Sequence, residues 1–304
     1  MQPAWPRALQ EGDQVAFVSP ASKPCKERLG KGISLLQSWG LVVEDLSPEP
    51  VGWRAGSDAD RQAHLQRALD EEAFRAVICT RGGFGASRIV DRISFNRFVE
   101  RAAAFVGFSD ATTLHTALNA HDVVTFYGPA LAWDPKNGEH PPRSIAADSL
   151  RSALFDRPPQ AVSSDPAEPT RSLSKGETAV GRLVGGNIST LASGVGTPSQ
   201  LRATGAIVLL EEIEEPHLTI DRLLTQLGRS GSLDGAAGFV VGQLPVPDVE
   251  KALAVIEEHL AQFDVPILGG VPVGHGEHQR TVALGAVVEI DPAEGTLRYV
   301  EVAD

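Results

Sequence analysis

Hydrophobic residues in the first half of the chain form short continuous runs, separated by segments with helical spacing. The runs predict five strands: 14–20 (QVAFVSP), 41–46 (LVVEDL), 75–80 (RAVICT), 102–108 (AAAFVGF) and 122–128 (DVVTFYG). The segments 25–40 and 58–74 predict amphipathic helices, because their apolar residues recur every three or four positions. Near-continuous apolar strands that alternate with helices form a parallel sheet covered on both faces. We therefore expect an α/β unit with a Rossmann- or flavodoxin-like sheet.

The pattern changes after about residue 134. Two stretches rich in Pro, Ser, Asp and Glu, 134–144 and 156–177, flank a short helical piece near 146–154. Such a composition is typical of connecting segments. We therefore predict an N-terminal α/β domain over 1–135, a linker over 136–175, and a second domain over 176–304.

The second half contains fewer clean strand–helix repeats. Its apolar runs predict strands at 205–212, 238–244 and 265–273, and its helical spacing predicts helices at 219–228 and 249–263. The stretch 281–302 reads as a hairpin that turns at DPAEG, residues 291–295.

Charge and composition narrow the range of partners. The 304 residues carry a formal net charge of −12, which disfavours a nucleic acid or an anionic membrane surface as partner. The N-terminal residues lack a secretory pattern and no apolar run is long enough to span a membrane, so we expect a cytoplasmic protein. Two cysteines, Cys25 and Cys79, make neither a disulfide framework nor a zinc site, and Cys79 is expected to be a buried apolar filler.

Ser109 occupies the corner between a predicted strand and a predicted helix, in GFSDA (107–111). A tight turn at this place would lift the serine hydroxyl above the sheet, as in a nucleophile elbow, although Ala111 replaces the last glycine of G-x-S-x-G. The amide of Asp110 would then be a natural oxyanion donor, because first-turn amides lack intrahelical partners. The alternative is that Ser109 is only a helix N-cap, a role that serine favours.

A glycine-rich turn, TRGGFGASR at 80–88, follows the third predicted strand. It fails as a dinucleotide fingerprint because Arg88 stands where the third glycine belongs and the turn does not follow the first strand. It can be an oxyanion loop that faces Ser109, or an ordinary strand–helix turn.

Two polar stretches in the second half offer partners for a serine. Glu211 and Glu212 end an apolar strand, and either could orient a histidine, although charge runs are usually solvated. His275 lies between two glycines in VPVGHGEHQR (271–280) and can be a general base or a surface histidine. His275, Glu277 and His278 are disfavoured as metal ligands because such closely spaced positions rarely converge on one ion.

Together these stretches resemble the LD-carboxypeptidase family of serine peptidases, which includes the microcin C immunity peptidases. The matching segments occur in family order from near Val15 to near Gly285: VAFVSPAS, ICTRGGFGASRIVDRI, FVGFSD, TFYGPAL, GRLVGGNISTL, LLEEIEEPHLTIDRLLTQL and PVGHG. The resemblance implies a smaller, mixed β/α C-terminal domain. It also implies a catalytic triad of Ser109, Glu211 and His275. The amides of Gly83 and Asp110 would form the oxyanion hole. The family usually has Glu-Asp where this chain has Glu211-Glu212.

The resemblance also implies a reaction. We expect a metal-independent serine carboxypeptidase without a cofactor, which removes the terminal D-alanine from murein tetrapeptides during peptidoglycan recycling. One alternative is the immunity-type cleavage of peptidyl- or aminoacyl-nucleotides, for which Trp133 could stack on the base. Another is a non-catalytic ligand-binding protein on the same fold. The expected partners are a small peptide substrate and a second copy of the chain in a homodimer, without nucleic acid or membrane.

Overall fold

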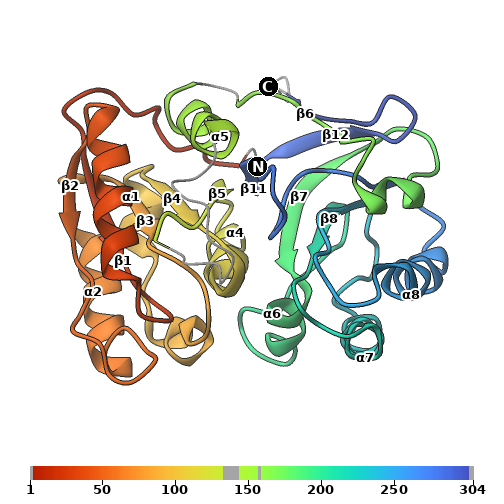
Figure 1. The fold of residues 1–304 in the computed structure, drawn as a ribbon, viewed down its shortest axis with the longest axis horizontal. Coiled ribbons are helices and arrows are strands. Elements are labelled where there is room, and N and C mark those ends of the chain that lie inside the picture. The colour runs from red at the N-terminus through yellow and green to blue at the C-terminus, as the bar shows by residue number, and fades with distance from the viewer. Residues whose placement is uncertain (1–2, 133–143, 157–158, 301–304) are drawn as a thin grey trace.

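Two β-sheets lie side by side in the computed structural model, which describes residues 3–132, 144–156 and 159–300 (Figure 1). Strands from the red to yellow-green part of the chain form the first sheet together with the blue strand β11, and green to blue strands form the second sheet (Figure 1). The α/β fold class expected from the sequence is confirmed: a parallel-strand sheet is combined with a second, mixed sheet.

The first sheet has the strand order β11-β5-β4-β3-β1-β2. Its members are β1 (Gln14–Val18), β2 (Val42–Asp45), β3 (Phe74–Cys79), β4 (Ala104–Gly107), β5 (Thr125–Tyr127) and β11 (Val282–Leu284). Strands β1 to β5 are parallel and run in the order 2-1-3-4-5, which is the flavodoxin-like arrangement. All five strands predicted in this half are therefore present, with shorter bounds than the apolar runs.

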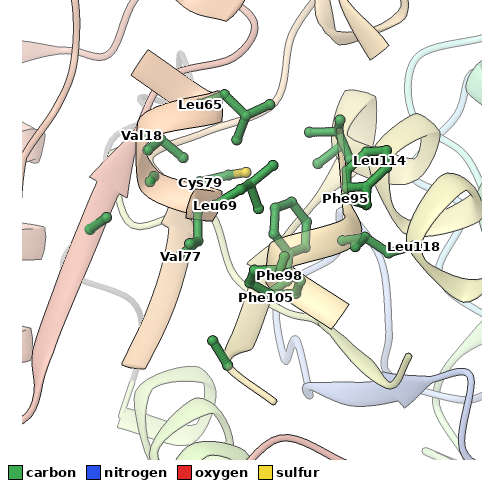
Figure 2. Close-up of a cluster of buried hydrophobic side chains, with 14 of the residues drawn as sticks. Val18, Leu65, Leu69, Val77, Cys79, Phe95, Phe98, Phe105, Leu114 and Leu118 are labelled. Carbon is green, nitrogen blue, oxygen red and sulfur yellow. The ribbon is translucent and has the colours of Figure 1, made fainter. Parts of the chain in front are cut away.

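Helices cover both faces of this sheet. The helical segments are α1 (Lys26–Ser38), α2 (Asp58–Asp70), α3 (Asn96–Glu100), α4 (Thr112–Asn119) and α5 (Ser144–Phe155), with the 3-10 turns η1 (Ala86–Arg88), η2 (Val90–Arg92) and η3 (Ser109–Ala111). Successive strand residues alternate between two cores. Val77 packs with Leu65 of α2, Phe98 of α3 and Leu114 of α4 (Figure 2), whereas the next residue, Ile78, faces the core that contains α1 and α5. Burial on both faces explains the continuous apolar runs.

The second sheet has the order β10-β9-β8-β7-β12-β13-β6. Its strands are β6 (Val162–Ser163), β7 (Ala179–Asn187), β8 (Ala206–Glu211), β9 (Gly238–Val241), β10 (Ile267–Leu268), β12 (Val287–Asp291) and β13 (Thr296–Tyr299). The accompanying helical segments are η4 (Pro169–Leu173), α6 (Ile188–Ser193), α7 (His217–Arg229) and α8 (Val249–Ala261). Strands β7 to β10 are parallel, and β12, β13 and β6 are antiparallel, so the sheet is mixed.

The two sheets share an apolar core. Helices α6, α7 and α8 cover one face of the second sheet, and the other face contributes Leu209 and Val240 to a cluster with Phe108 and Tyr127 of the first half. This shared core brings the end of β4, the end of β5 and the end of β8 close together. Those three strand ends carry the residues singled out in the sequence.

The C-terminal hairpin differs in part from the expectation. The hairpin at residues 291–295 is present, because β12 and β13 pair antiparallel around it. The preceding segment does not join this hairpin: β11 pairs antiparallel with β5 and extends the first sheet. The C-terminal part of the chain thus completes the sheet of the N-terminal part.

Two smaller expectations can be compared with the described residues. Cys79 is buried in the first core, where burial raises the pKa of its thiol, and Cys25 is partly exposed. The helical piece expected near 146–154 is α5, although part of the proposed linker lies outside the described residues. The domain boundaries stay a prediction.

None of the helices within the described ranges is long and apolar enough to cross a membrane.

Candidate active site

Ser109 sits in a strained turn directly after β4. Its φ angle is 58°, in the left-handed region that a residue with a side chain adopts at an energetic cost. The N-cap positions of η3 and α4 are occupied by Phe108 and Ala111, so the interpretation of Ser109 as a simple N-cap does not hold. Strand, strained serine and helix in this order have the form of a nucleophile elbow.

The glycine-rich loop after β3 lies directly against this elbow. A Cβ atom placed on Gly82 would stand 2.7 Å from the Cβ of Ser109, 2.8 Å from the carbonyl oxygen of Phe108 and 3.1 Å from the amide nitrogen of Asp110. Gly83 adopts a φ of 104°, and the Ser22 side chain fills the space where its own Cβ would be. The loop therefore faces Ser109 as expected, and the Gly83 and Asp110 amides remain the predicted oxyanion donors.

Two buried charged side chains hold the loop in place. The Asp110 carboxylate accepts a hydrogen bond of 2.7 Å from the amide of Ala86, and burial raises its pKa to about 6. On the other side, the fully buried guanidinium of Arg61 donates to the carbonyl oxygens of Pro20 and Gly85 and pairs with Asp58 at 2.5 Å. The loop is thus tied both to the elbow and to α2.

Glu211 and His275 form a buried pair beside the elbow. Glu211 is the last residue of β8 and is fully buried, and its Oε2 lies 2.6 Å from Nδ1 of His275. The His275 ring packs against Phe108, the residue before Ser109, with ring centroids 4.3 Å apart. The structure therefore brings together the elbow, the acid and the histidine, which are far apart in the sequence.

Glycines allow the His275 loop to approach this closely. A Cβ on Gly274 would stand 3.0 Å from both Cβ and Oε2 of Glu211, and one on Gly276 would collide with the side chain of Gln243. The Gly276 amide donates to Gln243 Oε1 at 3.0 Å, which fixes the loop on its far side. Larger residues on either side of His275 would push its ring away from Glu211.

Glu212 points the opposite way, as alternation along a strand predicts. Its carboxylate accepts hydrogen bonds from the amide and hydroxyl of Ser189, from Asn187 Nδ2 and from the amide of Ile213, at 2.6–2.9 Å. Burial raises the pKa of this carboxyl group above its usual value. Glu212 thus braces the start of α6, and Glu211 is the acid that contacts His275.

The remaining sequence candidates lie away from this cluster. Glu277 and His278 are exposed, and within the described parts of the chain no three His, Cys, Asp or Glu side chains are grouped to hold a metal ion. Trp133 lies outside the described residues.

Two residues of the site had no role assigned from the sequence. Tyr127, the last residue of β5, is fully buried and places its hydroxyl between Glu211 and the backbone of Ser109. Gly82 abuts Ser109 more closely than its sequence position suggested. Both lie in the quoted motifs TFYGPAL and TRGGFG, but their partners are brought together only by the fold.

Replacing Gly82 with alanine tests the contact between the loop and the elbow. The new Cβ would meet the backbone of Phe108 and the Cβ of Ser109, so loop or elbow must shift. We expect kcat to fall about 100-fold, because displacements of about 1 Å at a reacting group can cost this much. Steady-state kinetics with purified protein measures the effect.

Gly30→Ala is the matched control. Gly30 lies on the exposed side of α1 with no atom within 4 Å of a new Cβ, so activity should not change and stability should rise by about 0.5–1 kcal/mol. Normal kcat in Gly82→Ala would show that the loop does not need this close approach.

With this geometry established, comparison with known families assigns the chain. Residues 15–128 match the LD-carboxypeptidase N-terminal domain and residues 180–290 match the LD-carboxypeptidase C-terminal domain. The chain belongs to the LD-carboxypeptidase family. It is 34% identical over 301 residues to the probable murein peptide carboxypeptidase of Bacillus subtilis (strain 168), covering 96% of this chain and 92% of that protein. It is 26% identical over 294 residues to the murein tetrapeptide carboxypeptidase of Pseudomonas aeruginosa, covering 91% and 93%.

Solved structures share the fold. The microcin C7 self-immunity protein MccF matches with a TM-score of 0.85 at 22% identity, covering 99% of both chains. The muramoyltetrapeptide carboxypeptidase from Oxalobacter formigenes matches with a TM-score of 0.79 at 24% identity, covering 93% of this chain and 97% of that one. At these identities the likeness supports the two-sheet fold.

Proposed function

We propose that the protein is a metal-independent serine carboxypeptidase that removes the terminal D-amino acid from murein tetrapeptides. The observation that carries this proposal is the hydrogen bond between Glu211 and His275, whose ring packs against Phe108, the residue before the strained Ser109. Membership of the LD-carboxypeptidase family and the murein-peptide names of its relatives support the substrate class.

The proposed chemistry uses Ser109 as nucleophile. Its Oγ attacks the carbonyl carbon of the L,D-peptide bond while His275 accepts the hydroxyl proton through Nε2. The carbonyl oxygen gains negative charge, which the amides of Gly83 and Asp110 stabilise. His275 then passes its proton to the leaving amine, and the C–N bond breaks. D-alanine departs and the tripeptide stays as an ester on Ser109.

The second half of the cycle repeats these roles with water. His275 takes a proton from a water molecule, which attacks the ester carbonyl, and it returns that proton to Ser109 as the ester bond breaks. Glu211 accepts the Nδ1 hydrogen bond throughout, which keeps Nε2 available as a base and stabilises the imidazolium that forms. The products are a tripeptide and free D-alanine. A cytoplasmic location and a homodimeric state remain predictions.

A substrate comparison tests this function. Purified protein is incubated separately with a murein tetrapeptide, with the same peptide ending in L-alanine, and with aspartyl sulfamoyl adenosine, and the products are identified by mass spectrometry. We expect the D-alanine peptide alone to lose one alanine, at the same rate with and without a chelator.

Each other outcome has a defined meaning. Cleavage of the nucleotide conjugate with the peptide intact would favour the immunity-type activity. Loss of turnover on chelation, restored by zinc, would overturn the metal-independent mechanism. Binding of the tetrapeptide without any cleavage would favour the non-catalytic alternative.

A further inference from the structure

Tyr127 links the nucleophile to the acid across the two sheets. It ends β5 of the first sheet, and its hydroxyl donates a hydrogen bond of 2.7 Å to Oε1 of Glu211 at the end of β8. The same hydroxyl oxygen accepts a hydrogen bond of 3.1 Å from the amide of Ser109. One buried oxygen atom thus contacts both the elbow and the carboxylate that serves His275.

Both hydrogen bonds have a clear physical effect. The Ser109 amide belongs to a residue in the left-handed region, so an acceptor for it helps to stabilise the strained turn. On the acid, Oε1 is taken by Tyr127 and Oε2 by His275, so both carboxylate oxygens are fixed and the carboxylate cannot rotate without losing a bond. A buried carboxylate gains most from such charge-assisted hydrogen bonds.

The hydroxyl remains a donor over the working pH range. Burial and the neighbouring Glu211 carboxylate both raise the pKa of Tyr127 well above its ordinary value. The other titratable groups near this cluster are His115, whose ring lies 5.5 Å from that of Tyr127 and whose pKa burial lowers to about 4, together with His275 and Glu212.

We propose that Tyr127 is a positioning residue for the reaction: its hydroxyl sets Glu211 for His275 and holds the Ser109 turn in register with that pair. This inference rests on the proposed serine mechanism. Tyr127 acts through Ser109 and Glu211, and its effect should therefore appear in the chemical step rather than in substrate binding.

The test is Tyr127→Phe. The ring contacts to Phe108 and His115 remain and only the hydroxyl is lost. We expect kcat to fall about 10- to 100-fold with KM nearly unchanged, since hydrogen bonds to charged groups and to supporting residues carry effects of this size. We also expect the acid limb of the kcat/KM profile to move to higher pH, because a Glu211 carboxylate that has lost one donor interacts more strongly with the imidazolium of His275.

Tyr299→Phe is the matched control, because Tyr299 is the only other tyrosine in the chain. The hydroxyl of this partly buried residue accepts a hydrogen bond of 2.9 Å from the amide of Ala283 in β11 rather than from a residue of the proposed triad. This variant loses a comparable bond, so its stability should fall while kcat and the pH profile stay those of the wild type. In a Glu211→Gln background, the added Tyr127→Phe change should have little further effect on kcat.

A second measurement covers the case in which Tyr127→Phe does not fold. In Tyr299→Phe protein, 3-fluorotyrosine incorporation alters position 127 alone and makes its hydroxyl a stronger donor, so the acid limb should move to lower pH. An unshifted profile, or a folded Tyr127→Phe with wild-type kcat, would overturn the positioning role. If Ser109→Ala is inactive in the same assay, the proposed function stands even though this inference fails.

Discussion

Replacing Ser109 with alanine should reduce kcat about 10⁴- to 10⁶-fold, which is the scale of losses when a triad nucleophile is removed. The change removes only the hydroxyl. The backbone amide of residue 109 can still donate its hydrogen bond to the Tyr127 hydroxyl, so the turn remains stabilised and the protein should stay folded. Kinetics on the D-alanine tetrapeptide and thermal unfolding of the same samples measure the two quantities together.

Ser38→Ala supplies the control for this experiment. Ser38 ends α1 on the exposed surface, and its hydroxyl donates to the carbonyl oxygen of Leu35 at 2.6 Å. Its replacement should leave the rate as it is. A Ser109→Ala protein that turns over substrate near the wild-type rate would rule out the serine mechanism.

Glu211→Gln should lower kcat about 10³- to 10⁴-fold, as removal of the orienting acid does in other triads. The reason is a mismatch of donors and acceptors. Tyr127 and His275 both donate to the carboxylate, one to each oxygen, whereas an amide offers one acceptor and one donor group. Whichever way the amide is turned, Tyr127 or Nδ1 of His275 loses its acceptor. Steady-state kinetics over a pH series records the loss.

Glu212→Gln is the adjacent comparison. Its side chain braces Ser189 and Asn187 rather than His275, so we expect a loss of about 1–3 kcal/mol in unfolding free energy with kcat near the wild-type value. Equal losses of kcat in the two variants would contradict the assignment of Glu211 as the orienting acid.

Much of the fold could be predicted from the sequence, because strands that are buried on both faces appear as continuous apolar runs. Residues such as Val77 and Ile78 face two different cores, so β3 reads as an unbroken apolar run. Strand β7 was not predicted. Gly185 and Gly186 interrupt its apolar pattern, and the Gly185 backbone approaches Leu209 so closely that a Cβ would lie 2.2 Å from its carbonyl oxygen. The three-residue β11 was assigned to the hairpin because its partner, β5, is far away in the chain.

The residues of the site also differ in whether the sequence alone could indicate them. Ser109, Glu211 and His275 stand at the ends of apolar strands or between glycines, which are local signals. Alternation along β8 predicts that Glu211 and Glu212 point to opposite faces, and the choice of Glu211 came from the family resemblance. Tyr127 carries no local signal, because a tyrosine that ends a short strand normally reads as core. Its hydroxyl finds its two partners, the Ser109 amide and Glu211, only because the fold brings the ends of β4, β5 and β8 together.

The pairing of β11 with β5 has a consequence for synthesis of the protein. The ribosome releases Ser109 and its elbow early, but β5 keeps an open edge until β11, which comes much later in the sequence, has been synthesised and has paired with it. His275 is translated shortly before β11, so the proposed base and the missing edge strand are synthesised almost together. A nascent chain that has not yet reached His275 therefore contains Ser109 without its proposed general base. Under the proposed mechanism, hydrolysis therefore begins only after the stretch from His275 to β11 has been synthesised.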